Sequence, residues 1–110
     1  MAKNMYRQTF ESRTGMDIES MRSLHSKIDS YLINEGFINW GEELHTLHYH
    51  SNEAAVNVIY RSLGNHSIGI LAAAENEAFL EEIAKALPEL TPKGDRTKIQ
   101  QQIPSIMNPA

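Results

Sequence analysis

Cysteine is absent from this chain of 110 residues. Its absence excludes a disulfide framework, a thiolate zinc site and a cysteine nucleophile. The chain also lacks an apolar run near the ~20 residues that a membrane-spanning helix needs. Residues 1–12 lack the apolar core of a signal peptide. We therefore expect a cytoplasmic protein with no membrane partner.

Positive charge is scarce in the body of the chain. The net charge is -4, and residues 1–16 and 91–110 each sum to +2, so residues 17–90 sum to -8. An acidic body with basic ends repels nucleic-acid phosphates over most of its surface. We expect no direct nucleic-acid partner.

Two stretches carry apolar residues at the 3.6-residue period of an amphipathic helix. In residues 17–36, Asp17 is placed to cap the first turn, and Gly36 stands where a left-handed residue ends a helix. Residues 76–87 form the second stretch, with Phe79 at the centre of its apolar stripe. Both stripes predict burial against a sheet.

Between these helices, alternating apolar residues predict three strands, in residues 45–50, 54–62 and 67–74. Because the links are short, we expect an antiparallel meander. The predicted fold is α+β, in the order helix, three-stranded meander, helix, with both helices on one sheet face. Residues 5–10 also alternate and are a candidate for an extra N-terminal edge strand. Gly69 and the alanines of the third strand indicate that something packs closely over it.

These patterns divide the chain into three parts. Residues 1–16 are a basic N-terminal arm or edge strand, and residues 17–90 form a single α+β domain. Residues 91–110 are a basic tail that holds three of the four prolines. We expect this tail to be ordered only if another segment holds it.

Three of the five histidines fall within six residues, at His45, His48 and His50. A strand places His48 and His50 on one face and turns His45 the other way. Two imidazoles fall short of the three or four ligands that zinc takes from a protein. We therefore expect no metal and no cofactor. The alternative is a small hydrolase or metal-dependent enzyme that uses His45, His48, His50 and His66.

The uncovered sheet face has a mixed apolar and polar surface. Such a face on a small sheet is typical of a surface that meets a partner or a second copy. The acidic face of the second helix offers a further contact surface. The leading prediction is a small acidic non-enzymatic protein-binding module, an adaptor, regulator or inhibitor of another protein, with a homodimer as its candidate assembly. The candidate binding residues are His48, His50, Asn57, Ile59, Arg61, Glu77 and Glu81.

Overall fold

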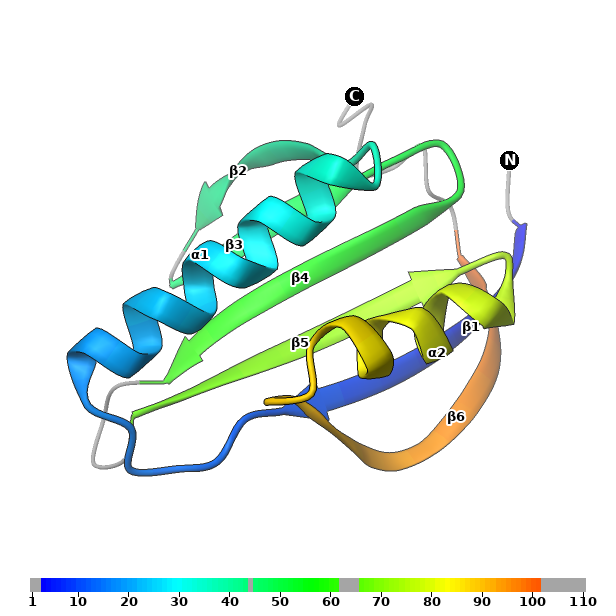
Figure 1. Ribbon diagram of the computed structural model, residues 1–110. Helices are drawn as coiled ribbons and strands as arrows, with labels where there is room; N and C mark the ends of the chain where they lie inside the picture. Colours follow the sequence, from blue (N-terminus) through cyan, green and yellow to red (C-terminus); the bar gives the residue numbers. More distant parts are fainter. Residues whose placement is uncertain (1–2, 44, 62–65, 102–110) are drawn as a thin grey trace.

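The computed structural model describes residues 3–43, 45–61 and 66–101. It has six strands and two helices, and both helices lie on the same side of the sheet (Figure 1). In chain order the elements are β1 (Lys3–Glu11), α1 (Ile18–Asn34), β2 (Ile38–Glu43), β3 (Thr46–His50), β4 (Ala54–Arg61), β5 (Ser67–Ala74), α2 (Glu77–Ala86) and β6 (Thr91–Gln101). Within the described residues, no helix is long and apolar enough to span a bilayer.

The sheet is antiparallel throughout, with the strand order β2-β3-β4-β5-β1-β6. The prediction of a three-stranded meander between two helices is therefore wrong. The meander has four strands, β2 to β5, and β1 and β6 extend the sheet beyond β5. The predicted edge position of the N-terminal segment is also wrong, because β1 pairs with β5 on one side and with β6 on the other.

The two edge strands lack the alternation that marks a strand in a sequence. In β2, every residue except Gly41 is exposed, and a register shift interrupts its pairing with β3 between Asn39 and Gly41. β6 contains Pro92 and Gly94, and Gly94 has a positive φ of 75°. Both strands depend on a neighbour's backbone hydrogen bonds more than on buried side chains of their own.

Gln8 helps to hold β6 in place. Its side chain is buried on the helix side of β1, and Nε2 donates a 3.0 Å hydrogen bond to the carbonyl of Gly94. This bond falls where the pairing of β6 with β1 shifts register. A buried amide normally has a hydrogen-bond partner. The C-terminal segment, expected to be ordered only if held, is thus bound to β1 as far as residue 101.

The first helix forms with the predicted signals at both ends. The Asp17 side chain accepts a 2.7 Å hydrogen bond from the Ser20 backbone N–H, which satisfies one of the amides that a helix start leaves unpaired. Gly36 follows the helix with φ at 89°. The face toward the sheet buries Leu24, Ile28 and Leu32.

The second helix is rotated relative to the predicted stripe. Leu80 and Ile83 are its buried residues, whereas Phe79 is half-buried at the flank. The Phe79 ring stacks on Phe37 at a centroid distance of 5.3 Å. Leu80 occupies the central position expected for Phe79. The main core lies between these helix faces and the side chains of β1, β3, β4 and β5 that point toward them.

Candidate functional site

The sheet face opposite the helices is the surface to which the predicted binding residues belong. The register of β3, β4 and β5 places directly paired residues on the same side of the sheet. His48 pairs with Asn57, and Asn57 pairs with Leu71. Within the described residues, neither helix covers this side (Figure 1). We call it the open face, and on β3–β5 it comprises His48, His50, Asn57, Ile59, Arg61 and Leu71.

A polar pair lies at its centre. His48 Nδ1 and Asn57 Oδ1 are 2.8 Å apart, and both side chains are half-buried. Because an amide oxygen only accepts, the imidazole donates through Nδ1–H. In the neutral ring Nε2 is then an acceptor. The sequence correctly places these two residues on one face.

His50 points to the open face, as the alternation predicts, but it is buried there and not exposed. Its side chain is 3% exposed, and the Trp40 ring packs edge-on against it at a centroid distance of 5.3 Å. Neither ring nitrogen has a hydrogen-bond partner among the described residues. The cover comes from β2, an element that the sequence does not reveal as a strand. The single tryptophan shortly before the histidines is the only sequence signal for it.

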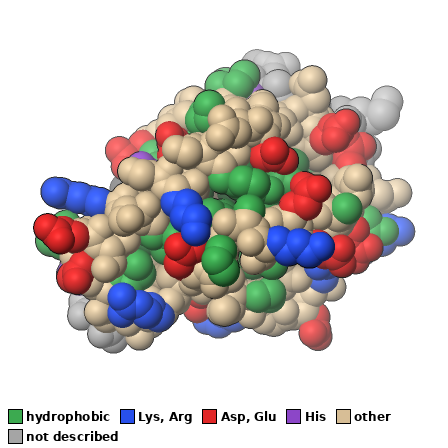
Figure 2. Space-filling view, viewed as in Figure 1, with side chains coloured by type: hydrophobic (Ala, Val, Ile, Leu, Met, Phe, Trp, Pro, Cys, Tyr) green, Lys and Arg blue, Asp and Glu red, His purple; other side chains and the backbone are tan. Residues whose placement is uncertain are grey.

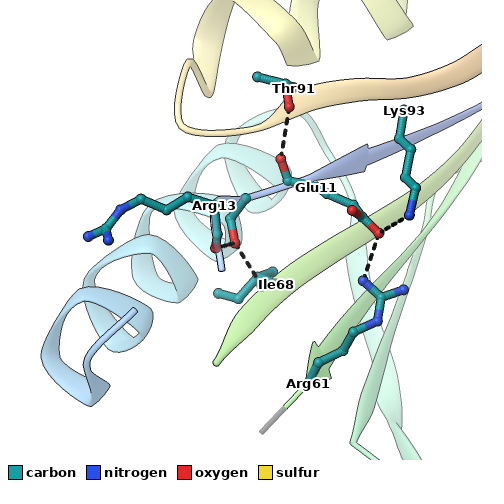
Figure 3. A network of polar contacts seen from close by, with 7 residues as sticks. Glu11, Arg13, Arg61, Ile68, Thr91 and Lys93 are labelled. Carbon is teal, nitrogen blue, oxygen red and sulfur yellow. Dashed lines mark hydrogen bonds and ion pairs between the residues drawn. The ribbon is translucent and has the colours of Figure 1, made fainter. Parts of the chain in front are cut away.

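An ion-pair network crosses the open face beyond Ile59. Arg61 Nη1 lies 2.9 Å from Glu11 Oε1, and Lys93 Nζ lies 3.2 Å from the same oxygen (Figure 3). To reach Glu11, the Arg61 side chain passes over Gly69, where an added Cβ would stand 3.0 Å from Arg61 Nη1. Gly69 and the alanines predict that something packs closely over β5. The Arg61 side chain is what packs there. The network joins Arg61 of β4 and Lys93 of β6 through Glu11 of β1.

Apolar side chains flank the His48–Asn57 pair and the ion pairs of Glu11. Ile59 and Leu71 are half-buried in the middle of the open face. At the β2 edge, Ile38 is 60% exposed and Trp40 is 45% exposed. Large side chains exposed to this extent on an unpaired strand edge mark a surface suited to association.

Glu77 and Glu81 belong to the opposite side of the molecule. Arg96 Nη1 lies 2.8 Å from a Glu77 carboxylate oxygen and 3.8 Å from one of Glu81. These contacts bind α2 to β6. On the helix side, acidic and basic side chains are interspersed (Figure 2). Of the seven candidate binding residues, five share the open face and these two lie apart from them.

The histidines proposed for an enzyme are also divided between the two sides. His66 lies near Tyr60 and α1 on the helix side, whereas His48 lies on the open face. His45 stands in the turn before β3 with φ at 65°, and its carbonyl accepts a hydrogen bond from the Tyr60 backbone N–H. Among the described residues, no group of three or more histidine or acidic side chains is placed to hold a metal ion.

Clearly shifted pKa values occur on the helix side and have structural causes. Burial, with Glu35 and Glu82 nearby, raises the pKa of Tyr31 to about 12. Burial also raises the pKa of Tyr49, whose hydroxyl donates a 2.6 Å hydrogen bond to Asp29. These phenols stay neutral at physiological pH. They connect α1 to its surroundings and are not poised for proton transfer.

Comparisons with protein-family models, with curated proteins and with solved structures give no match for this chain.

Proposed function

We propose that this protein is a small non-enzymatic protein-binding module, an adaptor or regulator, and that the open face is its contact surface. The observation that carries the proposal is a sheet face that neither helix covers within the described residues, with half-buried Ile59 and Leu71 in its middle and exposed Trp40 at its β2 edge. An interface of this kind has an apolar centre and a polar rim. Here the Arg61–Glu11 ion pair forms part of the rim, and the central His48–Asn57 pair has its hydrogen bond satisfied beside the apolar residues.

A second copy of this chain is the occupant that the charges favour. The open face carries the basic Arg7, Arg61 and Lys93 together with the acidic Glu11 and Glu43. A surface with both signs can match itself across a two-fold axis, the commonest symmetry of soluble oligomers. The acidic body outside this face would repel its own copy.

The size of the face is compatible with such an interface. The sheet is six strands wide at a spacing of about 4.8 Å, and its strands are about seven residues long at ~3.3 Å per residue. The product is a sheet area of roughly 650 Å². A standard protein interface buries about 800 Å² per partner. The exposed side chains of β2 would add to the sheet face itself.

Sedimentation equilibrium at about 100 micromolar, well above a ~1 micromolar affinity, tests the proposal. We expect a mass near twice 12.4 kDa. Trp40 is the only tryptophan, so its fluorescence should shift to shorter wavelength as concentration rises through the transition. Ile59→Glu should give a monomer, because it places a carboxylate in the apolar centre of the face.

Ile33→Glu is the matched control. Ile33 is 48% exposed on α1, on the other side of the molecule, and its variant should associate like the parent. A parent chain that is monomeric at this concentration would overturn the second copy as the occupant. Equal weakening by both variants would show that the contact lies elsewhere.

The enzyme alternative has less support, because a catalytic site gathers its groups in one concave pocket. His48 and His66 lie on opposite sides of the sheet. A cytoplasmic location and the lack of a direct nucleic-acid partner belong to the same proposal. The acidic body of the chain supports the lack of a nucleic-acid partner, and the absence of cysteine fits a cytoplasmic location.

A further inference from the structure

A separate hollow lies on the helix side, between the first half of α1 and the ends of β4 and β5. Its volume is about 310 Å³. Ile18, Met21, Arg22 and His25 line it from α1, Tyr60 lines it from β4, and His66 lines it just before β5. None of these side chains belongs to the open face.

The wall that solvent can reach is apolar. Ile18 is 56% exposed, and Met21, Tyr60 and His66 are half-buried. A volume of this size is at the lower end of small-molecule sites, about 300–1,000 Å³, which are mostly apolar with a few polar groups. The hollow has room for one alkyl chain or one ring.

The charge that lines the hollow has the opposite sign from the acidic body of the chain, residues 17–90. Of the described residues that line it, Arg22 carries the charge beside two imidazoles, and none is a carboxylate. Each of the four other principal hollows is lined by at least one glutamate. Among the described residues, the Arg22 guanidinium has no carboxylate within ion-pair distance. In a protein of net charge -4, this combination favours an anionic head group.

The His25 ring is held in position at this site. Its Nδ1 shares a hydrogen bond with the Tyr60 hydroxyl, and the two rings are 5.4 Å apart. The bond joins α1 to β4. A ring that is already oriented loses little freedom when it binds a ligand.

We propose that the hollow binds a small apolar carboxylate. The hydrocarbon part occupies the hollow against Ile18 and Met21. The carboxylate lies at the mouth, where Arg22 provides the charge and a fork of N–H donors that matches its geometry. The His25 and His66 rings line the hollow beside it. The site does not depend on the open face.

Calorimetric titration with decanoate, 1-decanol and decylammonium tests this assignment. These probes share one chain length and differ in the charge of the head group. We expect decanoate to bind with a Kd below about 1 mM, 1-decanol to bind more weakly, and decylammonium to bind weakest. Arg22→Gln should weaken decanoate about tenfold, because it removes a charge-assisted contact, and should change decanol binding by less than about twofold.

Ile18→Glu is the second variant. It adds a carboxylate at the mouth, and because Ile18 is more than half exposed in the first turn of α1, the fold should tolerate it. It should abolish decanoate binding and strengthen decylammonium binding. Arg7→Gln removes an exposed positive charge on the other face and should bind all three probes like the parent.

Equal affinity for decanoate and decylammonium would overturn the proposal. So would an Arg22→Gln variant that binds decanoate as the parent does, or a lack of decanoate binding at about 1 mM. Each variant is compared with the parent by circular dichroism, so that a lost fold is distinguished from a lost site.

Discussion

The substitution His50→Leu tests the structure through the sign of the change in stability that it causes. The His50 side chain is 3% exposed, Trp40 covers it, and both ring nitrogens lack a hydrogen-bond partner among the described residues. A buried polar group without a partner costs about 1–3 kcal/mol. Replacing it with an apolar group of similar size removes that cost. His50→Leu should therefore stabilise the protein, whereas most core substitutions destabilise.

The expected gain is measurable by calorimetry. We expect about 1–2 kcal/mol, since an imperfect fit of leucine beneath Trp40 offsets part of the gain. For 110 residues at about 2.1 cal/mol/K per residue, 1 kcal/mol shifts the Tm by roughly 4 °C. The Tm should thus rise by about 4–8 °C. The parent and the variant are scanned in the same buffer at the same pH.

His48 provides the matched control on the same strand and face. Its Nδ1 is bonded to Asn57, so His48→Leu removes a satisfied hydrogen bond and should cost about 0.5–1.5 kcal/mol. The two substitutions are chemically identical, yet they should move the Tm in opposite directions. If His50→Leu also lowers the Tm, the imidazole has a stabilising partner and the reasoning is wrong.

Two further predictions concern the core and alkaline pH. Ile28→Ala should lower the free energy of unfolding, measured in urea, by about 2–5 kcal/mol, because Ile28 is 1% exposed. The control Ile33→Ala lies on the exposed side of α1 and should change this free energy by less than about 0.5 kcal/mol. Burial and two nearby glutamates raise the pKa of Tyr31 to about 12 from an ordinary value of 10.0, so the folded state keeps a proton that the unfolded state loses. The stabilisation that comes from keeping the Tyr31 proton is complete below pH 10 and is lost as the pH rises toward 12. Urea midpoints should fall more steeply over that range in the parent than in Tyr31→Phe, and parallel curves would contradict the assigned cause.

The elements that the sequence predicts are those whose signals are local. Asp17 and Gly36 mark the ends of α1 by backbone chemistry that needs no tertiary contact. In β4 the alternation correctly assigns Asn57 and Ile59 to one face, because the side-chain period of a strand is fixed. These signals identify both helices and β3, β4 and β5, and the alternation in residues 5–10 marks a candidate strand within β1.

What the sequence does not predict depends on pairing between distant segments. Nothing near Tyr6 indicates that β1 lies beside Ala74 in the middle of the sheet. The exposed β2 has no buried stripe, and its bulge before Gly41 allows Trp40 to reach His50. The burial of His50 follows from that contact. Reading β3 alone therefore leaves His50 facing solvent.

β4 is the strand that the two proposed sites share, and its geometry keeps them apart. Tyr60 points to the helix side, into the hollow, whereas its neighbours Ile59 and Arg61 point to the open face. Because successive side chains of a strand lie on opposite faces, a ligand in the hollow does not contact a partner on the sheet. Ile59→Glu should leave decanoate binding unchanged, and Arg22→Gln should leave the sedimented mass unchanged. The failure of one proposal therefore leaves the other to be judged by its own experiment.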